Sequence, residues 1–242
     1  MIILIGLGAF LATFCGGLFA LKLKDQLHLI LGFSAGAVIG VAFFDLLPEA
    51  VELGSTYYDP STITAIVAGG FMIFMILDRF VIFHSHQHDE HSSTSHQISR
   101  GYLGAGSIAI HSFIDGLAIG LAFQVSSAVG LSVATAVLVH GFSDGMNSVN
   151  LILKNNGTRI QVLKWLSLHA TAPMLGITST LFFTLPAQAL GLILALFCGS
   201  FIYIGASDLL PESHHSHPTR LTTIMTIVGM AVMYLAIKLA GL

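Results

Sequence analysis

The sequence predicts an all-α integral membrane protein with eight transmembrane helices. Of its 242 residues, 55% are hydrophobic and only 9% are charged, and its mean hydropathy is +0.86. Soluble domains carry about 25% charged residues, so this composition cannot cover a water-facing surface. The apolar residues fall in long blocks between short polar breaks, and two polar motifs each occur twice. These observations exclude a large soluble domain and predict a single transmembrane domain over residues 1–242.

The predicted spans follow from the length of the apolar blocks. A block of about 20 apolar residues is long enough to cross a hydrocarbon core of about 30 Å. The breaks between the blocks hold Lys, Pro, Asn-Gly and charged residues, as at a membrane surface. The eight predicted spans are 1–22, 29–52, 62–83, 101–124, 128–153, 161–183, 187–208 and 220–241.

Basic residues predict the orientation, because Lys and Arg gather in cytoplasmic loops. With the N-terminus outside, eight of the nine Lys and Arg fall on the cytoplasmic side, and only Lys238 falls on the other. These eight are Lys22, Lys24, Arg79, Arg100, Lys154, Arg159, Lys164 and Arg220. We therefore expect a multi-pass protein of the cell membrane (inner or plasma membrane), with both termini extracytoplasmic.

A His-rich stretch separates the third and fourth spans, and we expect a cytoplasmic loop over residues 84–100. A second cluster, His214, His215 and His217, falls on the same side. Imidazole is a common ligand for zinc and related metals, so both clusters read as metal buffers, although a merely polar loop is the alternative. The candidate buffer residues of the loop are His84, His86, His88 and His91, with His96, Asp89 and Glu90 nearby.

One duplicated segment closes the second and seventh predicted spans. Asp-Leu-Leu-Pro-Glu occurs at 45–49 and again at 208–212. The two spans run in opposite directions, so the copies end on opposite sides of the membrane. This is the pattern of inverted repeats in transporters, here the first three and last three spans around a central pair. We expect Asp45 and Glu49 at the outer mouth of a cation path, and Asp208 and Glu212 at the inner mouth.

The central pair of spans carries the second duplication. His111 and Asp115 are four residues apart, as are His140 and Asp144, so each pair shares one helix face. The two spans are consecutive and antiparallel, which brings all four side chains to the middle of the bilayer. An ionised Asp there costs about 2.5–3.5 kcal/mol unless it is neutralised. A divalent cation does so, since two carboxylates, two neutral imidazoles and one M²⁺ sum to zero. The alternative is a helix pair held by Asp–His hydrogen bonds.

Two further polar residues are candidate metal ligands. Asn147 follows Asp144 by three residues and shares its face, so it is either an extra ligand or a partner for a neighbouring helix. His169, in the sixth predicted span, is a candidate ligand on the exit path, and a packed hydrogen-bonding histidine is the alternative.

These segments resemble the ZIP (Zrt/Irt-like) family of metal transporters, most specifically His111–Gly120, which reads HSFIDGLAIG. The resemblance covers all eight spans. It implies an inverted-repeat fold, outside termini, a homodimer, and uptake of zinc into the cytoplasm. By position, the four central His and Asp residues match the family's primary metal site. Ser112, Gly141 and Ala172 depart from the binuclear members, which favours one metal.

The expected function is therefore transport of Zn²⁺, with Fe²⁺, Mn²⁺, Co²⁺ or Cd²⁺ also compatible with mixed N/O ligands. The expected partners are the divalent ion, the lipid bilayer and a second copy of the chain, and no nucleic acid. We do not expect an enzyme, although a zinc-dependent intramembrane hydrolase is an alternative because His and Asp can also activate water. A metal-selective channel and a metal sensor are further alternatives.

Overall fold

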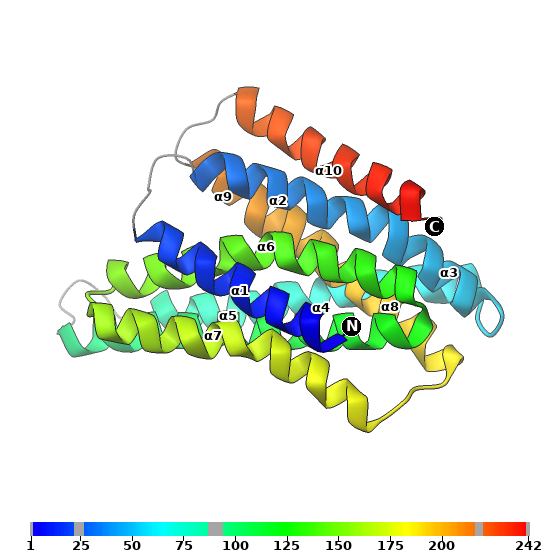
Figure 1. The fold of residues 1–242 in the computed structure, drawn as a ribbon, viewed down its shortest axis with the longest axis horizontal. Coiled ribbons are helices and arrows are strands. Elements are labelled where there is room, and N and C mark those ends of the chain that lie inside the picture. The colour runs from blue at the N-terminus through cyan, green and yellow to red at the C-terminus, as the bar shows by residue number, and fades with distance from the viewer. Residues whose placement is uncertain (1, 22–26, 87–93, 216–219, 241–242) are drawn as a thin grey trace.

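The computed structural model describes residues 2–21, 27–86, 94–215 and 220–240, and these residues form helices and short turns without a strand (Figure 1). The all-α prediction is confirmed. The helices are α1 (Ile2–Ala20), α2 (Leu27–Val41), α3 (Leu47–Ser55), α4 (Pro60–His86), α5 (Thr94–Val125), α6 (Ser127–Lys154), α7 (Arg159–Ser179), α8 (Ala187–Tyr203), α9 (Leu210–His215) and α10 (Arg220–Ala240).

Two of the eight predicted spans contain a widened turn. A π-helical turn, Ala42–Leu46, joins α2 to α3, and a second, Ile204–Leu209, joins α8 to α9. Each turn lies directly before the proline of the duplicated segment. The predicted spans ended at residues 52 and 208, whereas these two helices continue to Ser55 and His215. Proline lacks an N–H group and crowds the carbonyl four residues earlier, and a π turn accommodates this without breaking the helix.

The other predicted boundaries are close to the observed ones, with two corrections. The sixth predicted span reaches residue 183, but α7 ends at Ser179 and one 3₁₀ turn follows it, Thr180–Phe182. The predicted loop 84–100 is shorter, because α4 continues through His86 and α5 begins at Thr94. His84 and His86 thus lie in the last turns of α4 and not in a loop, and His88 and His91 lie outside the described residues.

The connection between α6 and α7 shows how the sequence ends one helix and starts the next. Asn156 has a φ of 62°, in the left-handed region that asparagine tolerates better than most residues, and Gly157 follows it. Thr158 then caps α7, since its hydroxyl accepts from the Gln161 N–H while the Gln161 side chain accepts from the Thr158 N–H. This capping box satisfies two backbone donors and fixes the start of α7.

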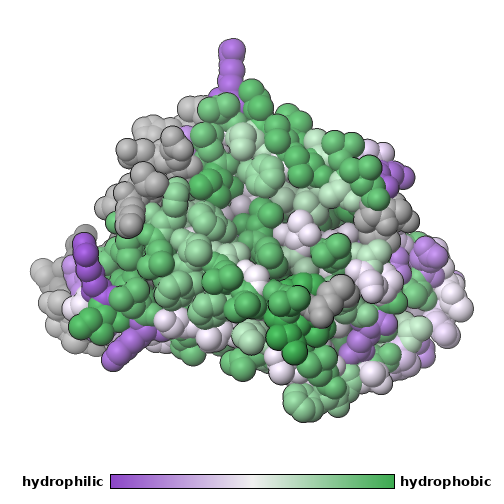
Figure 2. Space-filling model, viewed as in Figure 1, coloured by the Kyte–Doolittle hydropathy of each residue, from purple (hydrophilic) through white to green (hydrophobic). Residues whose placement is uncertain are grey.

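Seven helical segments of the described residues are long and apolar enough to cross a membrane. Helix α7 is not one of these seven segments, and it carries Arg159, Lys164 and His169. Hydrophobic side chains cover most of the visible face, and hydrophilic ones gather mainly towards its left and right edges (Figure 2). The chain is therefore a multi-pass membrane protein whose helices run between these two ends. Both termini lie at the same end (Figure 1).

The helices pack as two bundles. One contains α1, α5, α6 and α7, and the other contains α2–α3, α4, α8–α9 and α10. A hydrogen bond of 2.9 Å between the hydroxyls of Ser34 on α2 and Ser143 on α6 links them. The candidate metal ligands of α5 and α6 belong to the first bundle.

Close helix contacts at glycines repeat between the two halves of the chain. A Cβ on Gly36 of α2 would collide with the carbonyl oxygen of Thr226 on α10, and one on Gly199 of α8 would collide with that of Val67 on α4. The other equivalent pairs are Gly229–Phe33 with Gly70–Leu196, Gly116–Pro173 with Gly145–Thr13, and Gly176–Phe113 with Gly16–Phe142. For any two equivalent helices, the contacting residues are separated by the same number of residues in the sequence. The structure thus has an internal two-fold repeat that relates α1 to α7, α2 to α8, α4 to α10 and α5 to α6.

The two halves run in opposite directions. Equivalent spans are five apart in the chain, or one apart for α5 and α6, and successive spans alternate in direction, so an odd separation makes the two members of each pair antiparallel. This arrangement is the inverted repeat that the duplicated segments predicted. The repeat also assigns α7 to the membrane, because its counterpart α1 is one of the long apolar segments.

Candidate metal site

The glycine after each Asp of the duplicated motif determines which face of its helix packs against a neighbouring helix. A Cβ on Gly116 would collide with the Pro173 carbonyl of α7, and one on Gly145 with the Thr13 carbonyl of α1. Only glycine permits backbones to approach so closely. Both helices therefore turn their glycine face outward onto a neighbour and present His and Asp to each other.

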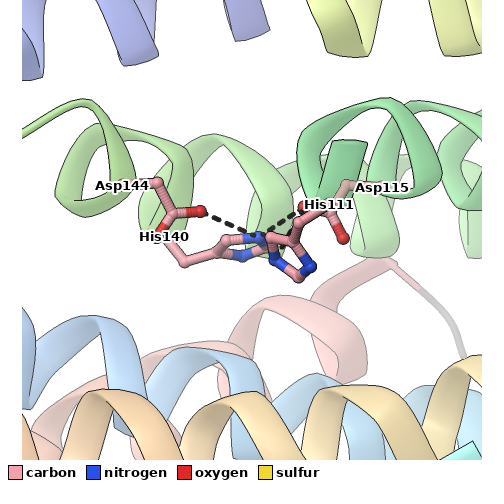
Figure 3. A group of neighbouring side chains, drawn as sticks. All are labelled: His111, Asp115, His140 and Asp144. Carbon is pink, nitrogen blue, oxygen red and sulfur yellow. Dashed lines mark hydrogen bonds and ion pairs between the residues drawn. The ribbon is translucent and has the colours of Figure 1, made fainter. Parts of the chain in front are cut away.

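The four side chains of the motif converge between α5 and α6 (Figure 3). We call His111, Asp115, His140 and Asp144 the quartet. Asp115 Oδ2 lies 3.2 Å from His111 Nε2 and 3.1 Å from His140 Nε2. His140 Nε2 also lies 3.9 Å from Asp144 Oδ2. One oxygen of Asp115 is thus shared by the two imidazoles.

The quartet is secluded from solvent. His140 is fully buried, Asp115 and Asp144 are buried, and only His111 is partly exposed, with 20% of its side chain accessible. Aromatic rings of the second bundle close the site, since Phe74 of α4 packs against the His111 ring and Phe201 of α8 against the His140 ring. The quartet therefore lies where the two bundles meet.

The hydrogen bonds of His140 fix which of its nitrogens can bind a cation. Its Nδ1 lies 2.9 Å from the carbonyl oxygen of Ala136, which can only accept, so Nδ1 carries a hydrogen. In a neutral imidazole, Nε2 then has a lone pair, and it faces the Asp115 carboxylate at 3.1 Å. Two acceptors at this distance need a proton or a cation between them. Nδ1 bonding to a carbonyl is also the usual way in which proteins orient a metal-binding histidine.

The carboxylate of Asp144 supports a cation at the same place. Its Oδ2 is buried and has no hydrogen-bond partner in the described part of the chain. A buried polar group without a partner costs about 1–3 kcal/mol, and more when it is charged. A positive ion at the centre of the quartet would remove this cost.

The spacing of the donor atoms suits a small divalent ion after slight closure. One donor atom from each of the four residues lies within 4.8 Å of the other three. Tetrahedral zinc with bonds of about 2.1 Å separates its ligand atoms by about 3.4 Å. The widest pair must therefore approach by about 1.4 Å, a shift that side-chain rotation can supply.

Of the two further candidate ligands, His169 is the more informative. It is fully buried on α7, and its Nε2 lies 2.7 Å from the Ser112 hydroxyl. Its Nδ1 has no hydrogen-bond partner among the described residues. Asn147 is half-buried on α6, one turn beyond Asp144.

The duplicated acidic segments lie at opposite ends of the site. Ser34 of α2 bonds to Ser143 and to the Val139 carbonyl of α6. The two helices are antiparallel, so Asp45, eleven residues further along, lies at the level where α6 begins, about 16 Å from Ser34 along the helix axis. Asp45 is buried, and its Oδ2 has no hydrogen-bond partner in the described ranges, while Glu49 is half-buried.

The second acidic segment has the equivalent position in the other half. The backbone of Asp208 lies in the π turn of α8–α9, as that of Asp45 does in the turn of α2–α3. Glu212 is exposed in α9. His214 and His215 end that helix, and His217 lies outside the described residues.

Two contacts of the site carried no signal in the sequence. The bond between Ser112 and His169 depends on the packing of α5 against α7, and the bond between Ser34 and Ser143 depends on the packing of the two bundles. Single serines in apolar helices have many uses. Gly116 packs α5 closely against α7 and so permits the first contact, but the sequence does not show which side chains then meet.

Comparisons with known proteins agree on one family. A family model described as "ZIP Zinc transporter" matches residues 83–237, more than half of the chain. The zinc transporter ZupT of Corynebacterium glutamicum is 30% identical over 249 residues, which cover 95% of each chain. ZupT of Corynebacterium aurimucosum is 27% identical over 95% of this chain and 93% of its own. The human zinc transporter ZIP6 is 33% identical over 108 residues, 44% of this chain and 14% of its own.

Proposed function

The chain belongs to the ZIP zinc transporter family, and from this premise we propose that it carries Zn²⁺ through the quartet into the cytoplasm. It is a transporter of divalent metal ions and not an enzyme, so the alternative of an intramembrane hydrolase is wrong. The observation that carries the proposal for the site is the burial of two carboxylates and two imidazoles around one point.

The charge balance of the quartet favours an M²⁺ ion. Asp115 and Asp144 carry two negative charges when ionised, and they lie inside a low-dielectric bundle where like charges repel strongly. One divalent ion with two neutral imidazoles makes the site neutral. Mixed N/O ligands suit Zn²⁺, and Fe²⁺, Mn²⁺, Co²⁺ and Cd²⁺ share this chemistry. We name zinc first because the relatives are described as zinc transporters.

The proposed path joins the quartet to the two acidic segments. The ion enters past Asp45 and Glu49 and leaves past Asp208 and Glu212. The unpaired, buried Oδ2 of Asp45 supports a cation on the entry side. Asn147 and His169 are proposed as auxiliary groups at the site, and the unpaired Nδ1 of His169 supports its part.

The proposed direction rests on the basic residues. Six of the seven Lys and Arg in the described ranges belong to the end of the bundle where α6 ends and α7 begins, so we propose that this end is cytoplasmic and that both termini are external. These six are Arg79, Arg100, Lys154, Arg159, Lys164 and Arg220. In this orientation, in the cell membrane, the His-rich segment of residues 84–96 and the cluster at 214–217 face the cytoplasm. We assign them to buffering of the released metal.

The position of the quartet between two bundles suits a carrier. Its four ligands belong to one bundle, and Phe74 and Phe201 of the other bundle cover it. A sliding or rocking movement of one bundle against the other would expose the ion to one side and then the other. A homodimer is proposed from the family resemblance.

Flux in proteoliposomes tests the proposal. Zn²⁺ entry into vesicles that contain the purified chain is expected to saturate with concentration and to fall to the level of empty vesicles in Asp115→Ala and Asp144→Ala. Asp59→Ala is the control, because Asp59 is exposed before α4 and outside the quartet. Zinc binding without flux would support the sensor alternative, and flux that survives both quartet substitutions would refute the site. A competition series with the other four metals then establishes selectivity.

A further inference from the structure

One buried hydroxyl lies a helical turn beyond the quartet. Ser148 is fully buried on α6, and its Oγ has no hydrogen-bond partner in the described part of the chain. It follows Asp144 by four residues and therefore shares its helix face. Asp144 Oδ2 is unpaired as well. Two unsatisfied oxygens thus follow each other along one face of α6.

The unpaired state of Ser148 is unusual for a serine in a helix. Such hydroxyls normally donate to a carbonyl one turn earlier. Ser167 donates to Leu163 and Ser200 to Phe197 in this way. Ser148 makes no such bond, although it has a carbonyl of its own helix one turn earlier. Its hydroxyl is therefore available to a group that enters the space beside α6.

The register of the two central helices gives Ser148 a counterpart. Asp115 of α5 pairs with His140 of α6, and a Cβ on Gly104 would touch the Leu151 side chain further along. Each residue back along α5 is matched by one residue forward along α6. Ser107 of α5 consequently lies at the same level along the helix pair as Ser148 of α6. The level falls between the quartet and the end of the bundle where α5 begins.

The internal repeat shows that this pair of hydroxyls exists on one side of the quartet only. The motifs of α5 and α6 are 29 residues apart. This offset relates Ser107 to Ala136 and Ile119 to Ser148. Ala136 and Ile119 are both fully buried and apolar. At the first level beyond the quartet, the two ways out along α5 and α6 therefore differ, since one has hydroxyls and the other has hydrocarbon.

We propose that Ser148, with Ser107 at the same level on α5, is the first oxygen donor that the ion meets as it leaves the quartet towards the start of α5. The inference rests on the proposed function, because it assumes that an ion occupies the quartet. It also gives the path a polar step between the quartet and the segment of Asp208, which ends at the same side of the bundle (Figure 1).

A hydroxyl suits such a step better than a charged group. Conduction needs sites that are favourable enough to enter and weak enough to leave. A neutral serine oxygen can replace one water of a divalent ion, while a third carboxylate would hold the ion too strongly. Removal of the hydroxyl leaves an apolar stretch that the ion or its water must cross.

Zinc flux and zinc binding of the full chain, measured separately, test the proposal. In proteoliposomes, Ser148→Ala is expected to lower the maximal rate about tenfold, the effect of one hydrogen bond to a charged group. The zinc Kd in detergent, from titration calorimetry, is expected to change less than about threefold. Ser107→Ala should have a smaller effect in the same direction. The matched control is Ser200→Ala, which removes a buried hydroxyl that is satisfied within α8.

A cysteine variant separates a role in transport from a role in packing. Ser148→Cys puts a thiol on the path, and thiolates prefer soft metals. Cd²⁺ should then inhibit zinc flux at a concentration about tenfold lower than in the wild type or in Ser148→Ala. A wild-type maximal rate in Ser148→Ala, or unchanged Cd²⁺ sensitivity in Ser148→Cys, would overturn the inference. Wild-type chain without flux would instead refute the proposed function, so the two failures are distinguishable.

Discussion

The shared oxygen of Asp115 gives the sharpest test of the quartet. Asp115→Asn keeps the shape of the side chain but removes its charge. Its Oδ2 lies between His111 Nε2 at 3.2 Å and His140 Nε2 at 3.1 Å, so the amide NH₂ can donate to an imidazole lone pair. The substitution thus stabilises the metal-free site and removes an anionic ligand from the metal-bound site. Both effects weaken binding.

The expected change in the zinc Kd of Asp115→Asn follows from the burial of the Asp115 carboxylate. Removal of one partner from a buried ion pair costs about 3–5 kcal/mol. Because about 1.4 kcal/mol corresponds to a factor of ten, the zinc Kd should rise by about two to three and a half orders of magnitude. The burial of Asp115 and Asp144 excludes the screening that would reduce this figure at a surface.

Titration calorimetry of the purified chain in detergent measures this change. Asp59→Asn is the matched control, because it makes the same chemical change at an exposed carboxylate and should leave the Kd unaltered. Far-ultraviolet circular dichroism confirms that both variants keep their helices. A Kd in Asp115→Asn within about threefold of the wild type would show that zinc binds elsewhere in the chain.

Two further predictions follow from the same geometry. Protons compete with the ion for the imidazoles and carboxylates, because these groups bind metal only when deprotonated, so the zinc Kd should rise as the pH falls, and zinc should release protons into a weakly buffered solution. A Kd independent of pH would contradict ligation by His140. Gly70→Ala should lower the free energy of unfolding by about 1–3 kcal/mol, because its Cβ would collide with the Leu196 carbonyl, whereas Gly69→Ala, with nothing within 4 Å, should not destabilise the chain. Thermal denaturation in detergent compares the two, and equal midpoints would refute the packing argument.

The sequence predicted the helices well because each apolar block has a single way to satisfy its backbone in lipid. The sequence-based prediction failed where packing between helices determines how far a helix continues. The predicted seventh span ended at residue 208, before Pro211, whereas the helix continues to His215. The preceding π turns let the helices continue, and neither turn has a distinctive sequence beyond the repeat itself.

The sequence predicted one part of the candidate site and gave no indication of another part. Four-residue spacing puts His and Asp on one face, and the antiparallel order of neighbouring spans then brings both faces together. The structure brings the four side chains to one point, as that reasoning required. The bond between Ser112 and His169 and the orphan hydroxyl of Ser148 depend on the distance between helices and on side-chain rotation. No spacing rule encodes either quantity.

The internal repeat constrains what these asymmetric residues can do. In the proposed carrier, two halves with equivalent glycine contacts exchange their arrangements, which gives the ion access to each side in turn. The electrochemical gradient of the ion decides the direction of net flux through a passive carrier, so the serines beside the quartet cannot set it. They can only change the rate at which the ion crosses one half of the path. In the proposed orientation this half of the path leads to the cytoplasm, so under that proposal the serines act on release of the ion and not on its capture.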